Sequence, residues 1–107
     1  MDVSNDDGPQ QFAQQRWQRA AGSTEIVLLR HGASMPYVPG NAFPLVDGQG
    51  DPPLSELGVA QAALSAERLA SEPFNALYAT SMQRTQQTVA PLAEALDMGV
   101  EIEPDLR

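Results

Sequence analysis

The chain has 107 residues, no cysteine and a net charge of −8. This length allows one domain at most, and the lack of cysteine excludes disulfides and thiolate metal sites. The negative charge disfavours binding to nucleic-acid phosphates. No apolar run is long enough for a signal peptide or a membrane span. We therefore expect a cytoplasmic protein that binds neither nucleic acid nor membrane, with its oligomeric state open.

The N-terminal region changes in character near residue 24. Residues 1–23 are polar and rich in glutamine, which predicts a disordered tail before a domain at 24–107. The short apolar run Ile26-Val27-Leu28-Leu29 then ends abruptly at Arg30-His31-Gly32. Such a run, rich in apolar side chains and bounded on both sides, predicts a strand buried on both faces of a sheet.

Residues 32–54 carry five of the nine prolines, which predicts a long connection that shapes the mouth of a pocket. We expect Asp47 and Asp51 to be solvated there. Ser55 is a candidate N-cap for the helix that follows. The apolar spacing predicts the inner face of this helix, formed by Leu57, Ala60, Ala63 and Leu64.

A second strand is expected at 76–79, after which Thr80-Ser81 open a second helix that ends at Gly99. Its inner face is predicted from the spacing of Val89, Leu92, Ala93 and Leu96. A third strand is expected to begin at 100–102. The order β-α-β-α-β predicts an α/β fold, with a parallel sheet and helices on both faces.

The candidate site follows from this topology. The carboxyl ends of parallel strands share one edge of a sheet, so we expect Arg30, His31 and Arg84 to meet there. Imidazole, guanidinium groups and helix N-terminal amides suit an anion, and the hydroxyls of Ser34 and Thr85 can add donors. No metal ligands stand at metal-binding spacing, and no cofactor is expected. Taken singly, a histidine after a strand is more often a packing residue, and a helix arginine is more often solvated.

Three stretches resemble the histidine phosphatase (phosphoglycerate mutase-like) superfamily. Leu29-Arg30-His31-Gly32 is similar to its signature motif. Leu54–Ala62 resembles the start of its first helix, and Tyr78–Thr88 resembles the segment with its second phosphate-binding arginine. The motifs come in family order, and the resemblance extends over residues 25–107.

This resemblance implies a three-layer α/β sandwich of which only the first β-α-β-α-β part is present. It implies that His31 is the phosphorylated nucleophile, and that Arg30 and Arg84 hold the phosphate of a small phosphorylated substrate. The family's site also needs a second histidine and a carboxylate proton donor, whereas this sequence contains one histidine. We therefore expect a domain truncated at its C-terminus and inactive alone.

The expected activity of the parent enzyme is metal-independent hydrolysis of phosphomonoesters. Two alternatives stay open. One is a mutase of the same superfamily, and the other is a noncatalytic module that binds phosphate or a partner through the same arginines.

Overall fold

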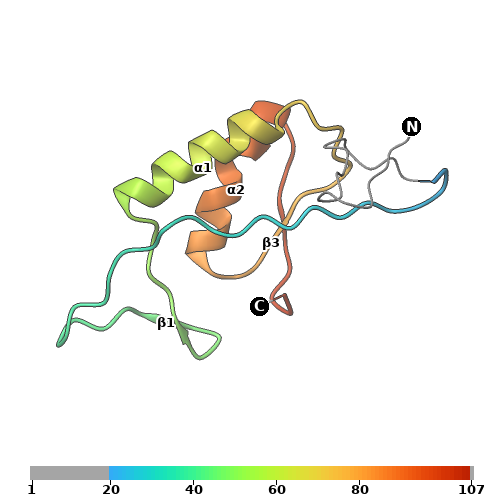
Figure 1. Cartoon of the computed structure of the whole chain (residues 1–107). Helices are drawn as coiled ribbons and strands as arrows, with labels where there is room; N and C mark the ends of the chain where they lie inside the picture. The colour runs from blue at the N-terminus through green and yellow to red at the C-terminus, as the bar shows by residue number, and fades with distance from the viewer. Residues whose placement is uncertain (1–19, 107) are drawn as a thin grey trace, which may run out of the picture.

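The computed structural model describes residues 20–106, so most of the predicted tail at 1–23 lies outside the described residues. In Figure 1 the helices lie above the hairpin, and the parallel strands run beside the second helix. The elements in chain order are β1 (Leu45–Val46), β2 (Gln49–Gly50), α1 (Glu56–Leu69), β3 (Tyr78–Ala79), α2 (Gln83–Leu96) and β4 (Glu101–Ile102). Within the described residues, no helix has the length and apolar character needed to cross a membrane.

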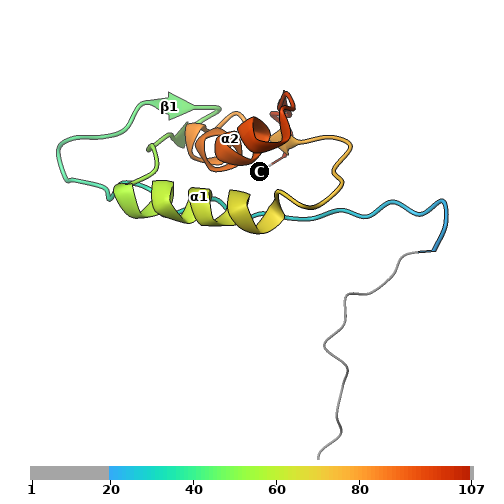
Figure 2. The same cartoon turned by 90° about the horizontal axis from the view of Figure 1, so that it is seen from above.

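The first helix begins where the sequence predicts. The Gly58 amide donates to Ser55 Oγ at 3.2 Å, which confirms Ser55 as the N-cap of α1. The helix packs against α2, and the two lie side by side in Figure 2. Its buried residues are small and spaced four apart: Gly58, Ala62 and Ala66.

The predicted inner face of α1 is therefore wrong. Leu57 and Leu64 are 61% and 66% exposed, and Ala60 and Ala63 are exposed as well. The helix turns its small residues inward because they allow close approach of neighbouring backbone, which leucine side chains would prevent. Its leucines are left on the opposite, open side.

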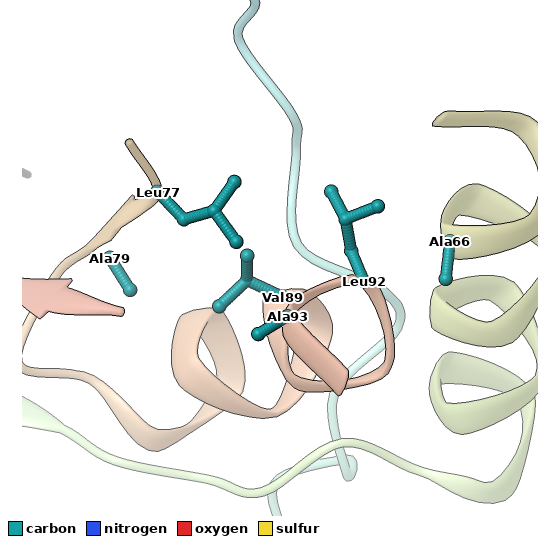
Figure 3. Close-up of a cluster of buried hydrophobic side chains, with 6 residues drawn as sticks. All are labelled: Ala66, Leu77, Ala79, Val89, Leu92 and Ala93. Atoms are coloured by element: carbon teal, nitrogen blue, oxygen red, sulfur yellow. The ribbon is translucent and has the colours of Figure 1, made fainter. Parts of the chain in front are cut away.

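The second helix buries the face that the sequence predicts. Val89, Leu92 and Ala93 are buried, and Leu96 packs against them while partly exposed. These three buried residues of α2 form the core shown in Figure 3 together with Ala66, Leu77 and Ala79. The helix ends earlier than the predicted Gly99, because Asp97 adopts a left-handed conformation (φ 53°) and its amide donates to the carbonyls of Ala93 and Glu94.

The parallel sheet is present as one pair of strands. Tyr78 pairs with Glu101 and Ala79 with Ile102 in the parallel register. The strand β3, the helix α2 and the strand β4 thus form a βαβ unit, as predicted for 76–102. Ala79 is buried under α2, whereas Tyr78 faces solvent.

The predicted strand at 26–29 is not formed. This segment belongs to neither sheet of the described residues, and its exposed fractions are 77% for Ile26, 45% for Val27, 92% for Leu28 and 39% for Leu29. A strand buried on both faces needs a neighbouring strand and a layer on each side, and residues 20–106 supply neither for this segment. Figure 1 shows it as an unpaired extended trace running past α2 and β3.

The long connection before α1 contains an antiparallel hairpin that the sequence analysis did not predict. Leu45 pairs with Gly50 and Val46 with Gln49. The two turn residues, Asp47 and Gly48, have φ values of 50° and 78°, as the tight turn of a two-residue hairpin requires. The turn of the hairpin lies near the N-terminal end of α2, where Asp47 accepts a hydrogen bond from Ser81.

Candidate functional site

The structure brings His31 and Arg84 to a common hollow of about 250 Å³. The hollow is lined by His31, Gln49, Thr80, Met82, Arg84 and Thr85. These side chains come from the extended segment after residues 26–29, the hairpin, the connection after β3 and the start of α2. The predicted meeting of His31 with Arg84 is thus observed, although the strand that was expected to position His31 is absent.

The imidazole of His31 is half-buried, and its Nδ1 lies 2.7 Å from the carbonyl oxygen of Gly32. A carbonyl oxygen only accepts hydrogen bonds, so this contact requires a proton on Nδ1. In the neutral imidazole, Nε2 then carries the free lone pair. This is the form of histidine that can attack an electrophile such as phosphorus.

Arg84 occupies the first turn of α2, as predicted, and reaches toward the hairpin. One of its terminal nitrogens donates to the Gly50 carbonyl at 3.2 Å. The bond uses one of five guanidinium N–H donors, so the group keeps capacity to bind an anion in the hollow. The hairpin therefore holds Arg84 at the edge of the hollow.

The turn that leads into α2 is fixed by a ring of hydrogen bonds. The Met82 amide donates to Thr80 Oγ1 at 3.2 Å, and the two threonine hydroxyls lie 2.8 Å apart. Thr85 Oγ1 in turn donates to the Met82 carbonyl at 2.8 Å. This ring fixes the side chains of Thr80 and Thr85 on one wall of the hollow.

The hairpin is also attached to the start of α2 by its two aspartates. The Gln83 amide donates to Asp51 Oδ1 at 2.8 Å, which caps the helix from outside its own segment. Ser81 Oγ donates to Asp47. The prediction of mere solvation is therefore wrong for Asp51, which is half-buried against the helix terminus, whereas Asp47 is exposed as predicted.

Two predicted site residues do not line this hollow in the described part of the chain. Arg30 is exposed, and Ser34 forms an isolated bridge with Leu54 before α1. Their proposed contacts with phosphate stay predictions. The sequence analysis in turn missed Gln49 and Thr80; the Asp47-Gly48 pair is the signal that could have located the hairpin and with it Gln49.

The groups around the hollow suit a phosphoryl group. They supply an imidazole nitrogen and a guanidinium within one small concave surface. Guanidinium groups bind tetrahedral oxyanions through parallel N–H donors. Among residues 20–106, no three histidine, aspartate or glutamate side chains gather in a way that could hold a metal ion.

Comparison with known sequences gives a consistent result. The sequence model of the histidine phosphatase superfamily (branch 1) matches residues 26–107. A probable phosphoglycerate mutase of Yersinia pestis is 34% identical over 83 residues, which cover 78% of this chain and 37% of the relative. A Yersinia pseudotuberculosis relative of the same description matches equally. The chain thus spans little more than a third of the length of these relatives.

Solved structures agree with the sequence comparison. A mycobacterial glucosyl-3-phosphoglycerate phosphatase superposes with a TM-score of 0.58 and 31% identity, over 72% of this chain and 34% of the phosphatase. A structure of the same phosphatase in complex with VO3 gives the same TM-score and identity, over 35% of that chain. The predicted α/β fold class is thereby confirmed, with the chain matching part of the larger fold.

Proposed function

Because this chain belongs to the histidine phosphatase superfamily, we propose that its parent enzyme hydrolyses small phosphomonoesters through a phosphohistidine at His31. The observation that carries the proposal is the shared hollow, in which His31 faces the same space as Arg84. An imidazole with Nδ1 bonded to a carbonyl presents Nε2 as the nucleophile, and a guanidinium beside it binds the oxygens of the transferred group.

The proposed reaction has two steps. In the first, His31 Nε2 forms a bond to phosphorus while the bond from phosphorus to the ester oxygen breaks, and the leaving oxygen takes a proton from a general acid. In the second, water attacks phosphorus as the bond from phosphorus to Nε2 breaks, and the conjugate base of the general acid takes a proton from this water, which releases phosphate and regenerates the neutral imidazole. Arg84 binds the nonbridging oxygens throughout, and Arg30 and Ser34 are proposed as further phosphate ligands.

The general acid and a second histidine are proposed to come from outside this chain. The sequence contains one histidine, and the chain spans 37% of its Yersinia pestis relative. We therefore propose that residues 24–107 form the N-terminal part of a larger histidine phosphatase domain. In this arrangement the chain contributes the nucleophile and the arginine clamp, and the rest of the domain completes the site. The cysteine-free composition fits a cytoplasmic enzyme.

A mutase is the second candidate, because the Yersinia relatives are described as probable phosphoglycerate mutases. A mutase returns the phosphoryl group to a bound hydroxyl, whereas a phosphatase gives it to water. A noncatalytic phosphate-binding module is the third candidate, since the arginine clamp alone would serve that purpose. The hydrolase is preferred because the superposed structures carry a phosphatase description.

A chimera tests the proposal. Residues 26–107 would replace the matching segment of the mycobacterial glucosyl-3-phosphoglycerate phosphatase. We expect the folded chimera to release phosphate from an aryl phosphate in the presence of excess chelator, and His31→Ala to abolish this activity. A folded chimera that needs added magnesium or zinc would contradict the mechanism. Transfer of phosphate between phosphoglycerates with negligible release to water would favour the mutase. Binding of phosphate without turnover would favour the noncatalytic module.

A further inference from the structure

Thr88 is a polar residue in the middle of α2, yet its side chain is only 3% exposed. It lies next to Val89 on the face of the helix that packs inward. A hydroxyl at such a position is tolerated only when it is hydrogen-bonded. Both of its hydrogen bonds lead to residues at or beside the candidate site.

The hydroxyl of Thr88 both donates and accepts. Its Oγ1 donates to the Arg84 carbonyl at 2.6 Å, one helical turn earlier. It accepts from the amide of Gly32 at 3.1 Å, across 56 positions of the chain. The segment around His31 belongs to no sheet in the described residues, so this bond is a direct attachment of that segment to α2.

Gly32 uses both of its backbone groups in this arrangement. Its amide is held by Thr88, and its carbonyl oxygen lies 2.7 Å from His31 Nδ1. The bond from the amide holds the peptide plane before Gly32 against α2, and the next plane, which carries the Gly32 carbonyl, is held by the Ala33 amide donating to Gln61 Oε1 at 2.8 Å. One buried hydroxyl therefore connects the protonated nitrogen of the imidazole to the helical turn that carries Arg84.

We propose that Thr88 is a positioning residue, which holds the Nε2 lone pair of His31 and the guanidinium of Arg84 in register around one phosphoryl group. The residue does not line the hollow and acts through Gly32 and the helix backbone. The inference rests on the proposed function. Its first measurement, however, is the position of a proton on His31, which needs no substrate.

The test uses the whole chain, whose one histidine gives one imidazole in a nitrogen-resolved NMR spectrum. We expect the neutral imidazole of the wild-type chain to be protonated at Nδ1. Thr88→Val keeps the branched shape but removes the hydroxyl, so the imidazole should shift toward the Nε2-protonated form. Affinity for orthovanadate should fall about tenfold, because a buried amide loses its acceptor. Thr88→Ser should retain both properties.

Val89→Ala is the matched control, since it removes core packing at the next position without touching the hydroxyl. It should lower stability while leaving the tautomer and the vanadate affinity unchanged. A folded Thr88→Val variant with the wild-type tautomer and affinity would overturn the proposal. If Thr88→Val does not fold, two other results would overturn the proposal. One is a wild-type imidazole that is protonated at Nε2, and the other is a Thr88→Ser variant whose imidazole loses the Nδ1 proton. A wild-type chain that has the Nδ1 tautomer but does not bind vanadate would contradict the proposed function. The role of Thr88 would then be tested by the tautomers of the variants alone.

Discussion

Gly32 and Gly58 lie backbone against backbone. A Cβ atom on Gly32 would stand 2.6 Å from the carbonyl oxygen of Gly58, and a Cβ atom on Gly58 would overlap the carbonyl of Ala33. The residue after His31 therefore packs directly on the first turn of α1. The backbone that approaches Gly32 this closely belongs to a helix.

Gly58→Ala should destabilise the chain by about 1–3 kcal/mol, because the added methyl overlaps fixed backbone. The sign of this change in stability is informative, since replacing glycine by alanine inside an unobstructed helix stabilises the helix by about 1 kcal/mol. Urea unfolding followed by circular dichroism measures the change. Gly99→Ala is the control, because a Cβ atom there meets nothing within 4 Å. A Gly58→Ala chain as stable as the wild type would refute the close contact.

Arg84→Ala should weaken orthovanadate binding by roughly 10- to 100-fold, because hydrogen bonds to a charged group are worth about 1.5–3 kcal/mol. Titration of the chain with vanadate, followed by the His31 signal, gives the affinity. Arg68→Ala removes a cation from the exposed last turn of α1 and should leave the affinity unchanged. Equal losses in the two variants would mean that vanadate responds only to overall charge.

The chain by itself should show no His31-dependent release of phosphate, even from an activated aryl phosphate. General acid assistance alone is worth about 10²–10⁴-fold in rate, and the proposed acid lies outside this chain. The measurement compares phosphate release and acid-labile phosphohistidine between the wild-type chain and His31→Ala. A wild-type signal that disappears in the variant would show that the chain suffices for catalysis.

The open side of the molecule should make the chain associate. Val27, Leu28 and Leu29 line a hollow of about 350 Å³ together with Leu64 and Leu69 of α1. Exposed apolar surface of this kind promotes self-association, so sedimentation should reveal species larger than the monomer. Leu28→Ser, at a side chain 92% exposed, should reduce association without loss of stability. Leu92→Ser, in the core, should unfold the chain instead. A wild-type chain that stays monomeric at high concentration would contradict this expectation.

The helices were predictable because they depend on local signals. Ser55 caps α1, and the spacing of Val89, Leu92 and Ala93 defines the inner face of α2. The meeting of His31 with Arg84 was predicted from strand order, but residues 26–29 belong to no sheet here, and the bond from the Gly32 amide to Thr88 attaches this segment to α2 instead.

The remaining features depend on contacts that periodicity does not encode. α1 has an apolar leucine face and a face of small residues, and only packing against neighbouring backbone decides which one is buried. The segment 26–29 has the composition of a buried strand but lacks neighbours among the described residues. The attachment of Asp51 to the start of α2 joins segments that are far apart in the sequence.

The hairpin β1–β2 reaches the start of α2 through Asp47, Gly50 and Asp51, and one of these contacts is with Arg84 itself. The hairpin beside the hollow and the guanidinium proposed to bind phosphate are therefore mechanically coupled. A substitution that reshapes the entrance for a different leaving group would also displace the guanidinium. Under the proposed function, a change in the residues of the hairpin would therefore alter substrate choice and phosphate affinity together.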